Sequence, residues 1–241
     1  MIEVMRSNPV IIIQARMNST RLPGKMLMLL GMQSLLECLV TSMARVKNKA
    51  SVVVATSDQA ADDPIEAACR GLDCSVYRGT PNNVLARFIG AMSEANASSA
   101  VRVCGDSPFL SRLLVEEMIE RHINGTQDIT TNIQTRTFPK GMSVEVFERG
   151  SLERAASLAV DSSDLEHVTP VFYRHSDQFV IENIQHEPSA GDVEFSVDTK
   201  EDYQTALALR ASMSRDSGEY SVSELLLMKD QQARSCGPVR L

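Results

Sequence analysis

The first half of the chain alternates short runs of β-branched residues with longer stretches of helical periodicity. The run VIII, from Val10 to Ile13, has no polar side and is typical of a strand that is covered on both faces. Further apolar runs at 51–55, 74–77 and 100–104 are each followed by apolar residues at helical spacing. This alternation predicts an α/β, Rossmann-like fold with a mostly parallel sheet, right-handed crossovers and helices on both faces.

The pattern changes after Asp128. The segments DITTN and TRTFPKGMSVEVF, followed by a helical pattern, predict a small strand-rich excursion at about 128–178. The chain then returns through FVIENI at 179–184 and EFSV at 194–197, two runs of strand length, before a helix from about Lys200. A length of 241 residues suits one domain, 1–241, with the excursion as an insertion.

Composition excludes several classes of protein. The formal net charge of -7 argues against general binding to nucleic acid, which depends on a basic surface. Five cysteines without a CxxC pair indicate reduced thiols rather than a disulfide framework or a zinc site. The N-terminal apolar run is short and no later run could span a bilayer. We therefore expect a cytoplasmic protein with no nucleic acid and no membrane partner.

Three cations follow the first predicted strand, in the segment QARMNSTRLPGK. Arg16, Arg21 and Lys25 leave the carboxyl end of that strand, where parallel sheets bind their ligands. Arg and Lys side chains suit phosphate oxygens, so a nucleoside triphosphate is one interpretation and a solvated basic loop is the other. The segment matches neither GxxxxGK[ST] nor GxGxxG, which excludes a P-loop and a dinucleotide fingerprint. The loops that begin at Gln14, Thr56, Arg78 and Gly105 are expected to converge on one cleft.

Two carboxylates also follow predicted strands. Asp106 in VCGDSPF and Asp198 in SVDTKED could hold Mg²⁺ beside phosphates, because this hard cation prefers oxygen ligands. Each has a structural alternative, since Asp106 suits a tight turn and either Asp198 or Thr199 suits a helix N-cap. The pair Asp62 and Asp63 stands just before a proline and is interpreted as helix capping.

The ordered motifs resemble those of the cytidylyltransferases that activate acidic sugars, above all the spore-coat-polysaccharide type. The similar segments run from Ile11 to Asp202 and are ARMNSTRLPGK, VVVATS, DDPIE, VYRGT with NVLARF, VRVCGDSPF, GMSVEVF, EHVTP and SVDTKED. The resemblance implies a fold of the nucleotide-diphospho-sugar transferase type, CTP and Mg²⁺, and release of pyrophosphate as a CMP-activated acidic sugar forms. It also implies a homodimer formed through the excursion.

The resemblance further implies roles for individual residues. Arg16, Lys25 and Asp106 would be catalytic, and Asp106 and Asp198 would bind the metal. The nucleotide-binding residues would be Ala15, Arg16, Arg21, Lys25, Thr56, Arg78, Thr80, Asn83 and Arg87. Amide, backbone and guanidinium groups in that set suit the polar edge of cytosine, although Asn82 or Asn83 could instead cap the following helix.

The identity of the acceptor is the part of the function that the sequence determines least. The resemblance places Arg136, Glu145, Glu166 and His167 in substrate-binding segments. Lys140 and Ser143 stand where many relatives have Asp, which favours a more anionic acceptor. The alternatives to a nonulosonate or octulosonate acceptor are a phosphonate or another small anion, and a non-catalytic nucleotide-binding subunit of the same fold. A glycosyltransferase is a weaker alternative, since it should prefer a nucleotide diphosphate sugar.

Overall fold

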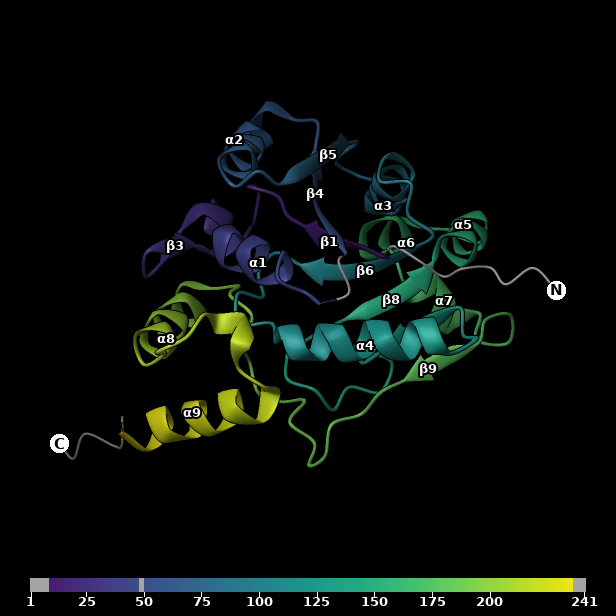
Figure 1. The fold of residues 1–241 in the computed structure, drawn as a ribbon. Helices are drawn as coiled ribbons and strands as arrows, with labels where there is room; N and C mark the ends of the chain where they lie inside the picture. The colour runs from purple at the N-terminus through teal and green to yellow at the C-terminus, as the bar shows by residue number, and fades with distance from the viewer. Residues whose placement is uncertain (1–8, 48–49, 236–241) are drawn as a thin grey trace.

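One seven-stranded sheet organises the molecule (Figure 1). The computed structural model describes residues 9–47 and 50–235. The sheet has the order β5-β4-β1-β6-β8-β7-β9, and β5, β4, β1 and β6 are parallel. Its strands are β1 (Pro9–Gln14), β4 (Ser51–Ser57), β5 (Ser75–Gly79), β6 (Ser99–Cys104), β7 (Ile129–Thr131), β8 (Glu145–Glu148) and β9 (Ile181–Asn183), while β2 (Leu29–Leu30) and β3 (Gln33–Ser34) form a separate hairpin.

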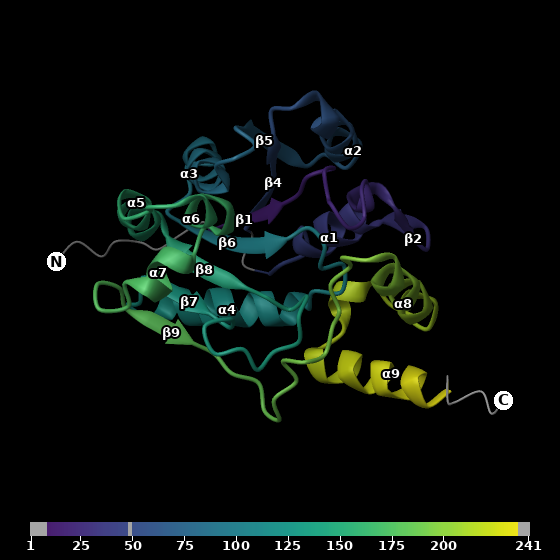
Figure 2. The same ribbon diagram turned by 180° about the vertical axis from the view of Figure 1, so that it is seen from behind.

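Helices cover both faces of the sheet, as the alternating sequence predicts (Figures 1 and 2). One apolar core lies beneath α1, α2, α4, α8 and α9, and a second lies beneath α3, α5 and α7. The helices are α1 (Leu35–Met43), α2 (Asp63–Gly71), α3 (Val84–Glu94), α4 (Arg112–Asn124), α5 (Arg149–Ser157), α6 (Ser162–His167), α7 (Pro170–Arg174), α8 (Lys200–Ala211) and α9 (Val222–Ser235), with 3₁₀ turns η1 (Lys25–Leu27), η2 (Ala60–Asp62) and η3 (Ser217–Glu219).

The central strand β1 contributes to both cores. Ile11 and Ile13 pack in the first core, Val10 and Ile12 pack in the second, and all four are fully buried. This is the two-residue alternation of a strand whose faces are both covered, so every residue of the run is apolar. Gln14 is the first polar residue after this run, and it marks the edge of the sheet where the chain reaches the surface.

The predicted excursion adds strands to the main sheet instead of leaving it. β8 pairs antiparallel with β6, β7 pairs antiparallel with β8, and β9 pairs parallel with β7. Val146 and Phe147 of β8 point into opposite cores, which explains why this segment is apolar on both sides. The excursion therefore shares the cores of the domain.

The prediction of a strand at 194–197 is wrong. This segment forms only an isolated bridge between Lys140 and Glu194, together with two backbone hydrogen bonds to other loops. Phe195 N donates to Lys140 O over 2.8 Å, and Val197 N donates to Asp106 O over 2.8 Å. Its apolar residues are buried against the first core without extending the sheet, and the second bond brings Asp198 next to the end of β6.

Local capping explains where two helices begin. Ser34 and Glu37 form a capping box at the start of α1, and Thr199 and Asp202 form another at the start of α8. In the second box Thr199 Oγ1 accepts from Asp202 N over 3.1 Å, so Thr199 is the N-cap of the two candidates. Asp198 is thereby left free to contact other side chains.

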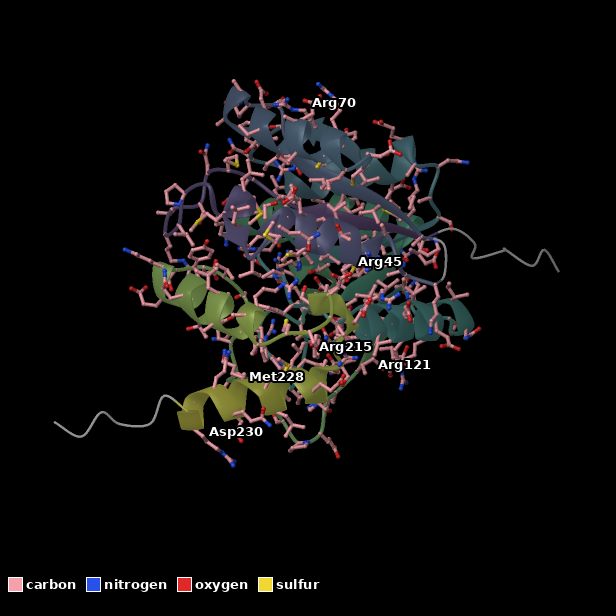
Figure 3. All side chains as sticks on the ribbon, turned by 60° about the vertical axis from the view of Figure 1, so that its left-hand side comes forward. Arg45, Arg70, Arg121, Arg215, Met228 and Asp230 are labelled. Carbon is pink, nitrogen blue, oxygen red and sulfur yellow. The ribbon has the colours of Figure 1, made fainter. Side chains whose placement is uncertain are left out.

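The last helix packs at one end of the domain. Figure 3 shows Met228 on the side of α9 toward the rest of the chain and Asp230 on its outer side, where it pairs with Arg234 over 2.7 Å. Throughout residues 9–47 and 50–235, no helix has the length and apolar character that crossing a membrane requires.

Candidate active site

A polar cleft of about 260 Å³ opens at the carboxyl ends of β1 and β6. Its walls come from the 14–21 loop, Lys25 and Met26, the 104–106 turn, Asp198, and Arg87 of α3. Two of the four loops expected to converge therefore meet here, the loops that begin at Gln14 and at Gly105. Thr56 and Arg78 are not part of its lining.

Gly105 allows the two strand ends to approach each other. Its backbone N donates to Gln14 O over 2.9 Å, and a Cβ at this position would lie 2.8 Å from Gln14 O and 2.8 Å from Met26 Sδ. Real Cβ atoms do not reach such distances, so any larger residue would separate the loops. Asp106 follows directly, and this close approach sets its position in the cleft.

Lys25 holds the two predicted metal-binding carboxylates together. Its Nζ donates to Asp106 Oδ2 over 3.0 Å, to Asp198 Oδ1 over 2.8 Å and to Val197 O over 2.9 Å. The side chain of Lys25 is only 8% exposed, against 28% for each carboxylate. All three protons of the ammonium group are thus satisfied in a site that opens toward the cleft.

Arg21 completes the charge balance of this cluster. Its Nη2 lies 2.9 Å from Asp198 Oδ2, while its side chain is 63% exposed. Two cations and two carboxylates therefore neutralise one another, with the arginine at the mouth and the lysine below it. An incoming triphosphate could take over the arginine at little cost, because exposed ion pairs contribute only about 0–1 kcal/mol.

The carboxylate pair fits a hard cation. Asp106 and Asp198 already share one positive group, the Lys25 ammonium, and their oxygens are the ligands that Mg²⁺ prefers. Among the described residues no group of three or more His, Cys, Asp or Glu side chains is placed to hold a metal ion. Two carboxylates with remaining positions for phosphate and water match the usual Mg²⁺ site better than a closed protein cage.

Asp62 has a role that its sequence context does not reveal. It stands at the N-cap of α2 but makes no capping bond, so the interpretation as a helix cap is wrong for this residue. Its buried carboxylate instead accepts from Met17 N over 2.6 Å, from Ser57 N over 3.3 Å and from the Ser57 hydroxyl. Asp62 thus ties the cationic loop to the end of β4, and only the three-dimensional contact identifies it.

Arg16 faces a residue 150 positions away. Its Nη2 lies 2.8 Å from Glu166 Oε1, with both side chains about half exposed. Hydrogen bonding from Arg16 lowers the pKa of Glu166 below its usual range. The contact brings together a predicted nucleotide-binding residue and a predicted substrate-binding residue at the rim of the cleft.

Arg87 is a buried cation in the wall of the cleft. It is 2% exposed, and its Nη1 donates to Thr80 O over 2.8 Å and to Pro81 O over 3.2 Å. Burial lowers the pKa of Arg87, and the nearby Arg16 lowers it further. Its Nε has no partner within the described part of the chain, so it retains a donor for a ligand.

The other predicted base-reading residues lie around this arginine or farther away. Ala15 lines the cleft, and Thr80 contributes its carbonyl to Arg87. Asn83 caps α3 by accepting from Ala86 N over 2.8 Å, as one of the alternatives predicted. Thr56 is fully buried at the end of β4, and its hydroxyl has no partner among the described residues.

Arg78 makes mainly structural contacts. It pairs with Asp63 over 2.7 Å and with Glu66 over 2.6 Å, and it donates to the backbone carbonyls of Ser57, at the end of β4, and of Gln59. Hydrogen bonding to Glu66 and Asp63 raises the pKa of Arg78. These bonds connect β5 to α2 outside the cleft.

The predicted acceptor residues do not form one cluster. Arg136 is exposed and donates to Ser143 Oγ over 3.2 Å, and His167 is exposed at the end of α6. Glu145 is 1% exposed and pairs with Arg102 over 2.6 Å. Arg102 is not among the predicted site residues, because an isolated Arg inside a strand carries no recognisable signal.

The sheet order and the cleft at its carboxyl edge define a fold of the nucleotide-diphospho-sugar transferase type. The sequence matches the cytidylyltransferase family over residues 10–227. It is 33% identical to the spore coat polysaccharide biosynthesis protein SpsF of Bacillus subtilis, over 90% of this chain and 92% of that protein. The chain therefore belongs to the cytidylyltransferase family.

Solved structures agree with this assignment. A cytidylyltransferase from Leptospira borgpetersenii superposes with a TM-score of 0.89 at 28% identity, covering 94% of this chain and 95% of that one. A CMP:2-keto-3-deoxy-manno-octonic acid synthetase in complex with CTP superposes with a TM-score of 0.67 at 18% identity, covering 85% and 99%. The second likeness is one of fold.

Proposed function

We propose that this cytidylyltransferase uses CTP to form a CMP-activated acidic sugar of the nonulosonate or octulosonate type and releases pyrophosphate. The observation that carries the proposal is the Lys25 ammonium bound to both Asp106 and Asp198 in a cleft rimmed by Arg16 and Arg21. The name of the Bacillus relative points to polysaccharide synthesis, and the octonic acid synthetase of similar fold was solved with CTP.

In the proposed reaction an acceptor oxygen attacks the α-phosphorus of CTP. The new O–P bond forms as the bond between the α-phosphorus and the bridging oxygen of pyrophosphate breaks, and the acceptor hydroxyl releases its proton to the solvent in the open cleft. Arg16, Arg21 and Lys25 would bind the triphosphate oxygens, which orients the leaving group and stabilises its charge. Asp106 and Asp198 would hold Mg²⁺, which supplies further neutralisation of the leaving pyrophosphate.

Base recognition in this proposal depends on the wall around α3. The spare Nε of Arg87 and the backbone near Ala15 are the groups in the cleft that suit cytosine oxygens and nitrogens. Asn83, Arg78 and Thr56 would act by shaping the neighbouring loops. The enzyme would work in the cytoplasm as a homodimer formed through residues 128–178.

The test is pyrophosphate release from CTP with a panel of nonulosonate and octulosonate acceptors, in the wild type and in Asp106→Asn. We expect turnover that requires added Mg²⁺ and falls about a hundredfold in the variant, the usual effect of removing one preorganised charge. Asp177→Asn, an exposed carboxylate beyond α7, is the matched control and should keep full activity. Equal rates for the wild type and the Asp106 variant would overturn the site.

The same experiment separates the alternatives. Turnover with a phosphonate and with none of the sugars would show that the acceptor is a phosphonate, and the assignment of the nucleotide site would stand. CTP binding in calorimetry without turnover on any acceptor would identify a non-catalytic subunit. Absence of CTP binding would overturn the proposed function itself.

A further inference from the structure

A row of polar side chains crosses four neighbouring strands just below the carboxyl end of β1. Register pairs Arg102 of β6 with Glu145 of β8, and Glu145 with Thr131 of β7. Gln14 of β1 joins the row through its contact with Arg102. Strand alternation puts all four on the face of the sheet that carries the second core, directly beyond its last apolar layer.

Both carboxylate oxygens of Glu145 accept hydrogen bonds from neighbouring side chains. Oε2 accepts from Arg102 Nη1 over 2.6 Å, and Oε1 accepts from the hydroxyl of Tyr173. The Tyr173 hydroxyl lies 2.8 Å from Thr131 Oγ1, which fixes it from the other side. The carboxylate is therefore a clamp that holds the guanidinium of Arg102 in one orientation.

Arg102 retains unused hydrogen-bonding capacity. A guanidinium has five N–H donors, and in Arg102 only the bond to Glu145 is short. Its Nη2 lies 3.4 Å from Gln14 Oε1, and its buried Nε has no partner in the described part of the chain. Buried donors without partners are costly and rare in folded proteins. A ligand that accepts hydrogen bonds would relieve this deficit.

The position of Arg102 separates it from the phosphate-binding side. Gln14 and Cys104, its neighbours on the same face, both line the cleft. Met26 and Val197, which flank the Lys25 cluster, belong to the first core and hence to the opposite face. A triphosphate on Lys25 and an acceptor near Arg102 would therefore enter the cleft from opposite faces of the sheet.

The charge balance at Arg102 limits how an anion can be recognised there. Glu145 already balances the charge of Arg102, which means that the pair attracts anions weakly from a distance. Recognition here must come from directed hydrogen bonds, for which the planar guanidinium and a carboxylate are well matched.

We propose that Arg102 binds the carboxylate of the acceptor and determines its acidic class, with Glu145 and Tyr173 as positioning residues. This inference rests on the proposed function and deepens it. Because Gln14 Oε1 faces Arg102, the Gln14 amide nitrogen is left to donate to the same acceptor.

The test compares acids with their uncharged methyl esters. We would titrate 3-deoxy-manno-octulosonate, N-acetylneuraminate and both methyl esters into wild type and Arg102→Gln, with and without CTP, by calorimetry. We expect Arg102→Gln to bind the acids at least tenfold more weakly, with CTP affinity within about twofold, because the variant loses a hydrogen bond between two charged groups. Unchanged acid affinity in the variant would overturn the proposal.

A double variant excludes a purely structural role. Arg102→Gln alone leaves Glu145 as a buried unpaired charge, whereas Arg102→Gln with Glu145→Gln removes the whole ion pair. We expect the double variant to regain the melting temperature that the single variant loses and still to bind the acids weakly. Recovery of acid affinity in the double variant would mean that Arg102 only balances Glu145. If Arg102→Gln alone does not fold, the affinity of the double variant for the acids tests the proposal by itself.

The titrations without CTP keep this inference distinct from the proposed function. If the wild type binds no CTP, the proposed function is overturned. The affinities of the wild type and of Arg102→Gln for the acids, measured without CTP, still test the role of Arg102. A wild type that binds CTP but neither acid leaves the nucleotide site standing and overturns the role of Arg102.

Discussion

Lys25 and Asp198 are 173 residues apart in the sequence, yet the lysine Nζ lies 2.8 Å from the aspartate Oδ1. The chain brings them together from two directions, with Lys25 in the 3₁₀ turn after the β1 loop and Asp198 just before α8. Because Thr199 caps α8, Asp198 is free for Lys25. The site is thus preorganised by backbone elements on both sides.

Replacement of Lys25 by Met should strongly reduce catalysis. The ammonium group binds both carboxylates, so its loss leaves Asp106 and Asp198 without a shared cation and removes a charge from the proposed phosphate site. We expect the rate of pyrophosphate release to fall about a hundredfold, or about 3 kcal/mol of transition-state stabilisation. Lys47→Met, at a 75% exposed side chain, is the control and should keep its rate. A tenfold or smaller effect at Lys25 would contradict this role.

Replacement of Asp62 by Ala should weaken both the fold and nucleotide binding. The buried carboxylate accepts from Met17 N and from Ser57, and removing it leaves these donors unpaired at about 1–3 kcal/mol. Urea unfolding and CTP calorimetry would measure the two effects. Asp63→Ala is an adjacent control, since Asp63 is 61% exposed and its ion pair with Arg78 should contribute less than about 1 kcal/mol. Equal losses in the two variants would show that the buried hydrogen bonds of Asp62 contribute no more than the exposed ion pair of Asp63.

The sequence predicts the parallel half of the fold well because hydrophobic periodicity determines it. Runs such as Val10–Ile13 are apolar on both sides only when helices cover both faces, and the chain has that arrangement. The run at 194–197 shows the limit of this reasoning. Phe195 and Val197 are buried as strand residues would be, but their backbone bonds go to loops, and periodicity does not reveal the partner of a backbone N–H.

In the site too, the residues next to predicted strands could be placed from the sequence, whereas those that act through partners distant in the sequence could not. The cations of the β1 loop and Asp106 stand beside strand ends, so their positions follow from the strand prediction. Asp62 and Arg102 act through partners that are 45 and 43 residues away, Met17 and Glu145, and no local pattern encodes those contacts. Asp62 in particular occupies a helix-capping position without making the capping bond.

Replacement of Gly105 by Ala should disturb the cleft through one added methyl group. That Cβ would lie 2.8 Å from Gln14 O and 2.8 Å from Met26 Sδ, so β1 and the Asp106 turn must move apart. Overpacking of this kind costs about 1–3 kcal/mol, which chemical denaturation would detect, together with lower CTP affinity. Gly150→Ala is the control, because nothing lies within 4 Å of its Cβ position and α5 should gain stability. Unchanged unfolding of the Gly105 variant would contradict the close approach.

The ion pair between Asp164 and Arg174 predicts how stability depends on acid. Hydrogen bonding from Arg174 lowers the pKa of Asp164 from 3.8 to about 2. A carboxylate with a depressed folded pKa stabilises the fold fully above 3.8, and this contribution is lost as the pH falls toward about 2. In Arg174→Gln the folded pKa should rise toward 3.8, so the variant should lose less stability over this interval. Urea midpoints measured against pH would show this.

A matched control for this acid dependence is Arg70→Gln. Arg70 pairs with Glu66 on an exposed face of α2, visible at the surface in Figure 3. Its pH profile of stability should follow the wild type. An Arg174 variant with the wild-type slope between pH 4 and the acid limit near 2 would show that another group lowers the pKa of Asp164.

Replacement of Glu166 by Gln should tighten CTP binding. Glu166 Oε1 accepts a hydrogen bond from Arg16 Nη2 over 2.8 Å, and a triphosphate that binds Arg16 there would displace this carboxylate. An exposed pair of this kind contributes about 0.2–1 kcal/mol, so calorimetry should show an affinity gain of up to about fivefold. Glu153→Gln, which breaks a surface pair with Arg149, should change nothing. A tenfold weaker affinity in the Glu166 variant would show that the carboxylate supports the bound nucleotide rather than competing with it.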